Sequence, residues 1–451
     1  MTAPGSSKKS ALTLVQDFMR QSGRSYQAMV EISDRCNEVC VHCYQEQGNK
    51  GEMTTDEIRG LLDQFAQEGV LFLTLSGGEP TLRKDFVDIL EHAHGHRFVT
   101  KVFTNGITMT AELAEQFHRF AVFLVEISVY SHRAETHDFV TGVPGSFVRT
   151  VAGIRHLRQA GVSVLIKTPV MSINEDDLDH YVQLARDLDA DFRFDAEALR
   201  AREGGDRSPS VLSRSDPADR SVRERYGEHS KFGFVGPGRH DPTRAPCGAG
   251  VNVHVEPNGE LRACSLLEID LGNTREHGLS AVREGNETLD RIRTLSWGDL
   301  HGCRVCELSK YCQRCYASAL NEVGDALGPY PSACASAIRN YEARNAVNLG
   351  FVAGEPLGLT GPFQFQSDGT CERVPDVRTE ADNRLAQRFP WLRRAQVGEP
   401  PPRVGARPGE LVQLRRPGQK KAIKQRIPSG VEHDRVAEPS RLEWATTGGT
   451  E

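Results

Sequence analysis

The sequence predicts an α/β fold built around a parallel sheet. Six apolar runs, each about as long as a β-strand, recur within residues 26–195, and helix-length segments separate them. Strands and helices that alternate in this way form parallel sheets, because each helix returns the chain to the start of the next strand. The pattern fits an open doubly wound sheet or a partial barrel, and periodicity alone does not separate these two folds.

The apolar runs place the predicted strands at residues 26–33, 71–76, 98–104, 123–129, 163–170 and 191–195. The first helix is expected to begin after Thr54, which with Glu57 has the S/T-x-x-E spacing of a capping box. Later helices are expected to begin near Asp85, Ala111, Ser146 and Asp177. In either fold ligands bind where the strands end, so the residues that follow these runs are candidates for function.

Composition excludes several classes of protein. The chain has 451 residues, of which 38% are hydrophobic, and this is enough to form two or three domains. Its net charge of −6 has the wrong sign for a protein that binds nucleic acid electrostatically. There is no apolar run long enough to cross a membrane, and the first ten residues are polar. We therefore expect a cytoplasmic protein with no nucleic-acid or membrane partner.

The eleven cysteines are unevenly placed. Three lie within eight residues directly after the first predicted strand, seven more lie between Cys247 and Cys334, and Cys371 stands alone. Disulfides are rare in cytoplasmic proteins, so clustered thiols indicate metal or redox chemistry.

The first group is Cys36, Cys40 and Cys43, with the spacing C-x3-C-x2-C. Structural zinc sites normally close with four protein ligands, whereas a [4Fe–4S] cluster held by three cysteines leaves one iron open to an outside ligand. The spacing therefore favours iron–sulfur over zinc. His42 lies between two of the thiols, which is an awkward position for a fourth ligand.

This stretch, Cys36-Asn-Glu-Val-Cys40-Val-His-Cys43-Tyr44, resembles the signature of the radical S-adenosylmethionine (SAM) enzymes. The resemblance implies that the three cysteines hold a [4Fe–4S] cluster and that SAM chelates its open iron. It places His42 where the family usually has an aromatic residue near the adenine. Reductive cleavage of SAM would then give methionine and a 5′-deoxyadenosyl radical that abstracts a hydrogen atom from the substrate.

Further matches to the family follow later strands. Gly77, Gly78 and Glu79 resemble its GGE motif, in which glycines let the backbone approach SAM and the carboxylate pairs with the SAM ammonium. Asn105 belongs to a Thr-Asn-Gly that resembles the end of the family's third strand. By analogy with related enzymes, Ser128 and Arg149 contact polar groups of SAM.

The second group contains C-x2-C-x5-C-x2-C and, considered alone, would predict a zinc ribbon. It resembles the SPASM extension of radical SAM enzymes, which carries auxiliary iron–sulfur clusters and includes the probable hairpin turn at Asn258-Gly259. The resemblance assigns one cluster to Cys303, Cys306, Cys312 and Cys334. It assigns the other to Cys247, Cys264 and Cys315.

Two departures from the SPASM pattern affect this assignment. The family commonly has another cysteine between the positions of Cys247 and Cys264, and three residues rather than two between those of Cys312 and Cys315. The Cys247 cluster is therefore expected to have an open iron, a ligand other than cysteine, or fewer irons. Cys371 lies outside the pattern and is not expected to be a ligand.

The resulting organisation has five parts. We predict an N-terminal extension (1–24), a radical SAM core (25–200), a connecting segment (201–245), a SPASM domain (246–345) and a tail (346–451) that is rich in Pro and Gly and disordered in large part. The basic run of the tail, from Arg415 to Arg426, is expected to be solvated rather than to bind nucleic acid. By resemblance, the core is a partial (β/α)6 TIM-type barrel whose open side the SPASM domain completes.

The leading functional hypothesis is a radical SAM maturase that modifies a ribosomally made peptide. An electron donor such as flavodoxin or ferredoxin is expected as a partner. Residues 1–25 are too few for a peptide-binding domain, so a separate protein is one candidate for leader binding. His137 and Asp138 are either close to the substrate or only shape a loop before the helix at Ser146.

Three alternatives remain open. A sulfatase-type maturase shares most of the fold, and the missing cysteine between Cys247 and Cys264 counts mildly against it. A SPASM oxidoreductase that acts on a small molecule is the second. The third, from another class, is a scaffold protein stabilised by zinc, which the retained Cys36, Cys40, Cys43 and Glu79 disfavour.

Overall fold

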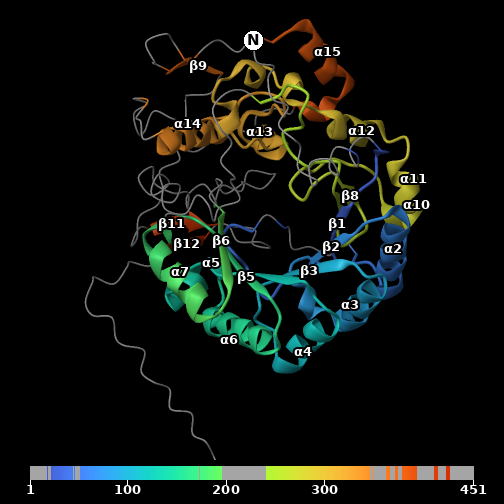
Figure 1. Ribbon diagram of the computed structural model, residues 1–451, viewed down its shortest axis with the longest axis vertical. Helices are drawn as coiled ribbons and strands as arrows, with labels where there is room; N and C mark the ends of the chain where they lie inside the picture. Colours follow the sequence, from blue (N-terminus) through green and yellow to red (C-terminus); the bar gives the residue numbers. More distant parts are fainter. Residues whose placement is uncertain are drawn as a thin grey trace, which may run out of the picture.

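The computed structural model describes residues 18, 22–43, 45, 51–171, 173–195, 240–345, 349, 362–365, 371–373, 378–393, 411–414 and 423–426 (Figure 1). Its centre is one eight-stranded sheet in the order β6-β5-β4-β3-β2-β1-β7-β8. The first six strands are β1 (Gln27–Glu31), β2 (Phe72–Ser76), β3 (Val99–Thr104), β4 (Leu124–Ser128), β5 (Val164–Pro169) and β6 (Asp191–Asp195). All six apolar runs therefore form strands, as predicted.

The strand order identifies the fold as a partial barrel. Strands β1 to β6 are parallel and adjacent in sequence order. A doubly wound sheet reverses its order at a switch point, and a barrel sheet does not. Figure 1 shows the sheet curving, with helices along its outer side. Among the described residues β6 and β8 are its two edges, so the barrel is partial, as the family resemblance implied.

Five helices cover the outer side: α2 (Thr55–Glu68), α3 (Phe86–Gly95), α4 (Ala111–Arg119), α6 (Ser146–Gln159) and α7 (Leu178–Asp187). The predicted capping box is confirmed, because the side chains of Thr54 and Glu57 each accept a hydrogen bond from the other residue's backbone N–H. Apolar residues of these helices and of the strands form one buried core. Short 3-10 turns, η1 (Pro80–Leu82) and η2 (Glu175–Asp177), precede α3 and α7.

One further helix, α5 (Ala134–Thr141), contains His137 and Asp138 and was not predicted from the sequence. The helix has only eight residues and a weak apolar periodicity, and it ends at Gly142 in the left-handed conformation (φ 73°). Such a short element gives little periodic signal in a sequence.

The cysteine-rich half adds two strands to the barrel sheet. Strand β7 (Val253–Val255) pairs in parallel with β1, and β8 (Leu261–Arg262) forms an antiparallel hairpin with β7. The predicted turn at Asn258-Gly259 joins them, and Gly259 has φ 86°, which favours glycine. The sheet thus continues past the segment that the sequence analysis treated as a boundary between domains.

The remaining elements of this half are short helices. They are α10 (Thr274–His277), α11 (Leu279–Arg283), α12 (Glu287–Thr294), α13 (Tyr316–Val323), α14 (Pro331–Asn345), η4 (Trp297–Asp299), η5 (Cys303–Val305) and η6 (Ser309–Tyr311). They surround the cysteines: η5 begins at Cys303, α14 contains Cys334, and the others lie in the turns between these elements.

Parts of the predicted tail are also described. They form the hairpin of β9 (Phe363–Phe365) and β10 (Cys371–Arg373), the helix α15 (Glu380–Arg388), the turn η7 (Pro390–Leu392) and the hairpin of β11 (Leu411–Leu414) and β12 (Ile423–Arg426). The other tail residues and most of the predicted connecting segment, including residues 201–239, lie outside the described residues. None of the described helices is long and apolar enough to span a membrane.

Candidate active site and metal centres

The first cysteine group lies on the loop that leaves the carboxyl end of β1. We name residues 33–43 the cysteine loop. Its backbone pairs with the end of α5: the N–H of Val39 donates to the carbonyl of Thr141, and that of Val41 donates to the carbonyl of Val140, both at 2.9 Å. The helix that the sequence analysis missed therefore supports the metal-binding loop.

The three thiols of the cysteine loop are close together and partly or fully buried. Cys40 packs into an apolar cluster with Tyr130, Phe139 and Met171, and Cys43 lies against the same cluster. Burial raises the pKa of the Cys40 thiol well above its usual value, with further contributions from Glu38, Cys43 and Cys36. Burial also raises the pKa of Cys36 to about 12. Thiolates need a bound cation in such surroundings, so this soft, three-sulfur donor set fits an iron–sulfur cluster.

Gly77 and Gly78 bring the end of β2 against this loop. The N–H groups of Gly78 and Glu79 donate to the carbonyls of Ser33 and Arg35, both at 2.8 Å. A Cβ on Gly77 would lie 2.4 Å from the Ser33 oxygen, and one on Gly78 would lie 2.4 Å from the Arg35 oxygen. Both positions therefore require glycine because the backbone of the cysteine loop lies so close to them. The resemblance had implied a different reason, a close approach of this turn to SAM.

Glu79 is completely buried where β2 and β3 end. One carboxylate oxygen accepts hydrogen bonds from the Thr104 hydroxyl (2.8 Å) and from the hydroxyl and N–H of Thr81, and the other accepts from the N–H of Asn105 (2.7 Å). Burial raises the pKa of Glu79, and these hydrogen bonds oppose the rise. Glu79 therefore ties the ends of two strands together.

Asn105 extends this network to the cysteine loop. Its side-chain amide donates to the Asn37 side chain at 2.6 Å and lies 4.0 Å from the sulfur of Cys36. Thr150 of α6 donates to the carbonyl of Asn105 at 2.9 Å. The Gly-Gly-Glu turn, the Thr-Asn-Gly turn and the cysteine motif, which are far apart in the sequence, are thus joined by hydrogen bonds.

Tyr130 is a site residue to which the sequence analysis gave no role. Its hydroxyl lies 3.9 Å from the sulfur of Cys40 and within reach of Ser128, and its ring meets the His42 ring edge-on with centroids 4.8 Å apart. Tyr130 therefore adjoins Ser128 and His42, two residues that the sequence analysis predicted to lie near SAM. The only signal in the sequence was its position two residues after β4.

Glu38 is a second such residue. It is buried, and its carboxylate accepts a hydrogen bond from the Cys40 thiol at 3.3 Å. Burial raises the pKa of Glu38 to about 8, while the positive charge of Arg149 lowers it. Arg149 is therefore near the cysteine loop, although its guanidinium also donates to the carbonyls of Gly145 and Pro144.

His137 and Asp138 contact neighbouring protein groups. His137 is completely buried, its Nδ1 accepts a hydrogen bond from the N–H of Tyr130 at 3.2 Å, and burial lowers its pKa to about 4. The Asp138 carboxylate accepts from the N–H groups of Gly145 and Phe147, so it caps the start of α6. These contacts support the interpretation in which the two residues shape this region.

The four cysteines assigned to the first auxiliary cluster come together. Cys312 is partly buried, and its thiol pKa is raised by desolvation and then by Cys334, Cys303 and Cys306, which surround it. Cys303 is the first residue of η5, Cys306 directly follows η5, and α14 carries Cys334. Cys371 of β10 lies beside Cys306, and burial, followed by the charge of Cys306, raises the pKa of the Cys371 thiol to about 12. None of the eleven cysteines is in a disulfide.

The three cysteines assigned to the second auxiliary cluster line one cavity of about 670 Å³. Cys312 also lines this cavity, which brings the two cysteine sets next to each other. Its other walls include Gln27 and Met29 of β1, His254 of β7, and His240, which stacks on Trp297. The donors that could complete a cluster of three cysteines therefore include imidazole and amide groups.

The inner face of the barrel carries a charged cluster around Glu126. Its neighbours in β4, Val125 and Ile127, pack into the core with the helices, so Glu126 points to the opposite face. The Glu126 carboxylate, only 2% exposed, is 2.9 Å from Arg193, 3.6 Å from Lys101 and 3.7 Å from Lys167. One carboxylate thus faces three cations. Lys167 also lies over the Phe103 ring, 3.6 Å from its centroid.

Comparisons with known proteins found a family model and several relatives that match this chain. Residues 30–185 match the model of the radical SAM superfamily. The chain is 30% identical to the mycofactocin maturase MftC of Mycolicibacterium smegmatis over 327 residues, which are 66% of this chain and 82% of that protein. It is 29% identical to an AdoMet-dependent heme synthase of Methanosarcina barkeri, over 67% of this chain and 94% of that protein. It is 26% identical to a PqqA peptide cyclase of Rhizobium meliloti, over 74% of this chain and 93% of that protein.

Solved structures share the fold. The structure of Streptococcus suis SuiB bound to its precursor peptide SuiA aligns with a TM-score of 0.53 and 14% identity, over 72% of this chain and 81% of that one. The structure of anSMEcpe with bound AdoMet aligns with a TM-score of 0.51 and 17% identity, over 71% of this chain and 97% of that one.

Proposed function

Because the chain belongs to the radical SAM superfamily, we propose that this enzyme abstracts a hydrogen atom from a ribosomally made peptide and so modifies it. A [4Fe–4S] cluster with SAM supplies the radical chemistry in this family. The observation that carries the proposal is the group of three partly or fully buried thiols at the carboxyl end of β1, joined by hydrogen bonds to the turns after β2 and β3. Peptide as the substrate class is supported by two relatives, a mycofactocin maturase and a peptide cyclase.

We assign the residues of this chain to three roles. Cys36, Cys40 and Cys43 hold the SAM cluster, as the family motif implies. Gly77, Gly78, Glu79 and Asn105 hold SAM and keep the cysteine loop in position, and Ser128, Arg149 and His42 contribute further contacts to SAM. Tyr130 and Glu38 adjoin Cys40 and restrict how water reaches it, because both are buried beside its sulfur.

The auxiliary clusters follow from the second cysteine group. Cys303, Cys306, Cys312 and Cys334 hold one, and Cys247, Cys264 and Cys315 hold the other with a ligand that is not cysteine. The cavity of the second set is also lined by the inner side of β1, so a substrate in the barrel would lie near it. Residues 25–200 and 246–345 then act as the radical SAM core and the SPASM domain. A reductant such as flavodoxin or ferredoxin, and a separate leader-binding protein, complete the system.

A small-molecule substrate is the second candidate, and a specific observation favours it. Three of the curated relatives are AdoMet-dependent heme synthases, and that of Methanosarcina barkeri aligns over 94% of its length. The excess of cations around Glu126 is also compatible with a substrate that carries carboxylates.

The first test measures cofactors and SAM cleavage. The protein is purified without oxygen, reconstituted with iron and sulfide, and compared with a variant in which Cys36, Cys40 and Cys43 are all Ala. We expect about eight to twelve irons, a loss of about four in the variant, and 5′-deoxyadenosine only from the unaltered protein. Zinc without iron would contradict the proposal and would favour the scaffold alternative.

The second test separates the substrate classes. The reconstituted enzyme is incubated with dithionite, SAM and either a short precursor peptide encoded beside its gene or an iron porphyrin. A mass change in the peptide, with deuterium transfer from labelled peptide to 5′-deoxyadenosine, supports the peptide. Transfer from the porphyrin alone would replace the peptide proposal with the second candidate.

A further inference from the structure

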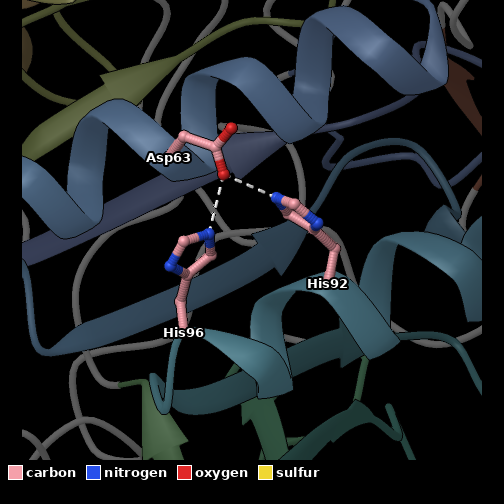
Figure 2. A group of neighbouring side chains, drawn as sticks. All are labelled: Asp63, His92 and His96. Atoms are coloured by element: carbon pink, nitrogen blue, oxygen red, sulfur yellow. Dashed lines mark hydrogen bonds and ion pairs between the residues drawn. The ribbon is translucent and has the colours of Figure 1, made fainter.

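A cluster of two histidines and an aspartate lies on the outer layer of the barrel, away from the cysteine motifs in the sequence. Asp63 belongs to α2, His92 to α3, and His96 caps the end of α3. Figure 2 shows both imidazoles directed at the same carboxylate oxygen. The Nε2 atoms of His92 and His96 are each 2.7 Å from Oδ1 of Asp63.

Packing beneath the cluster fixes this arrangement. His92 and His96 are four residues apart, so they lie on the same side of their helix. The helices α2 and α3 pack against each other through buried residues that include Leu62, Phe65 and Ile89. The backbone positions of the three side chains are therefore set by the core and not by the hydrogen bonds between them.

The donor set is suited to a transition-metal ion. Two imidazole nitrogens and one carboxylate oxygen lie within 4.8 Å of one another. Zinc binds such ligands at roughly 2.0–2.2 Å, which separates neighbouring donor atoms by about 3.4 Å in a tetrahedral site. The two 2.7 Å contacts would have to open by only about 0.7 Å, a change that side-chain rotation supplies.

The side chains are also accessible to an ion from solvent. The exposed fractions are 28% for His92, 31% for His96 and 45% for Asp63. Three protein ligands leave a fourth position for water, which is the usual composition of an open zinc site. Imidazole ligands favour zinc, nickel or copper over magnesium or calcium.

A second cluster of the same composition, His132, Asp177 and His180, provides an internal comparison. Its carboxylate is already paired with a cation, because the guanidinium of Arg133 lies 2.6 Å from Oδ2 of Asp177. A metal ion there would have to displace or adjoin a positive charge. No such pair with an Arg or Lys is found for Asp63 among the described residues.

We propose that Asp63, His92 and His96 form a binding site for one Zn²⁺ ion, which links α2 to α3 on the outer layer of the barrel. The site is separate from the iron–sulfur chemistry, and the proposal does not depend on the substrate.

The test uses the reconstituted holoprotein, so that iron occupies the cysteines, and measures zinc uptake by equilibrium dialysis with elemental analysis. We expect the unaltered protein to bind one more zinc ion than the double variant His92→Ala/His96→Ala, and Asp63→Asn to bind at least tenfold more weakly. His180→Ala, from the second cluster, is the matched control and should bind like the unaltered protein. Unchanged iron content and unchanged 5′-deoxyadenosine formation in each variant show that it is folded.

X-ray absorption at the zinc edge identifies the ligands. A first shell of nitrogen and oxygen at about 2.0–2.1 Å, with imidazole scattering and no sulfur at about 2.3 Å, supports the site. Equal zinc uptake by the double variant and the unaltered protein, a sulfur shell, or loss of zinc in His180→Ala alone would overturn it.

Discussion

Glu126 offers a direct test of the charged cluster on the inner face of the barrel. Replacing it by Gln removes a carboxylate that three cations of the described structure share, and the summed charge of these four side chains rises from +2 to +3. Removing one partner of a buried ion pair typically costs about 3–5 kcal/mol. Lys101, Lys167 and Arg193 retain 25–30% exposure and regain hydration, so we expect the lower end, about 3 kcal/mol.

The matched control is Lys101→Met, which lowers the local charge to +1 and leaves Glu126 paired with Lys167 and Arg193. We expect this substitution to lower the free energy of unfolding by less than about 1 kcal/mol, because only a weaker ion pair is lost and two cations still neutralise the carboxylate. Thermal unfolding of the two variants measures the difference. At about 2–4 °C per kcal/mol for a domain of this size, Glu126→Gln should lower the midpoint by about 6–12 °C. A drop below about 2 °C, or a larger drop for Lys101→Met, would refute the electrostatic argument.

Three further predictions concern the metal sites and their supports. Cys334→Ala should lower the iron content by about four, whereas Cys371→Ala should leave it unchanged; equal losses would make Cys371 a ligand. Gly78→Ala should abolish SAM cleavage and disturb the SAM cluster, because its Cβ would lie 2.4 Å from a carbonyl oxygen of the cysteine loop, and normal activity would contradict this. His137 has a pKa of about 4 in the folded protein, below its unfolded value of about 6.5, so the unfolded state binds more protons between these values. Stability should therefore fall as the pH falls from about 6.5 to 4, by up to about 3 kcal/mol, and His137→Gln should flatten this slope in pH-dependent denaturation.

The sequence was sufficient for the parallel sheet because each strand of the barrel carries apolar residues that are buried on its helix side, and helix-length segments separate the strands. It could not distinguish a barrel from a doubly wound sheet, since that depends on strand order and not on periodicity. The six strands agree with their predicted ranges to within one or two residues. Strand β7 contains three residues and pairs far along the chain with β1, so no local pattern could have placed it.

Site residues divide in a similar way. The cysteines and the Gly-Gly-Glu turn have distinctive spacing, and they were found from it. Glu38 and Tyr130 were not given roles, because one is an ordinary residue between two cysteines and the other follows a strand by two positions. Their importance comes from burial beside Cys40, which is a property of the folded chain. The same holds for Asp63 with His92 and His96, since their helices meet only through packing.

Strand β1 connects the regions that hold the two groups of cysteines, which are more than 200 residues apart in the sequence. Its carboxyl end leads into the cysteine loop, and its inner side supplies Gln27 and Met29 to the cavity of the second cysteine set. The edge of β1 that faces away from β2 pairs with β7. The hairpin of β7 and β8 then carries the chain directly to Cys264. A change that weakened the pairing of β1 with β7 would therefore be expected to affect the auxiliary cluster at Cys247 and Cys264 before the SAM cluster, whose loop is held independently by α5 and by the turns after β2 and β3.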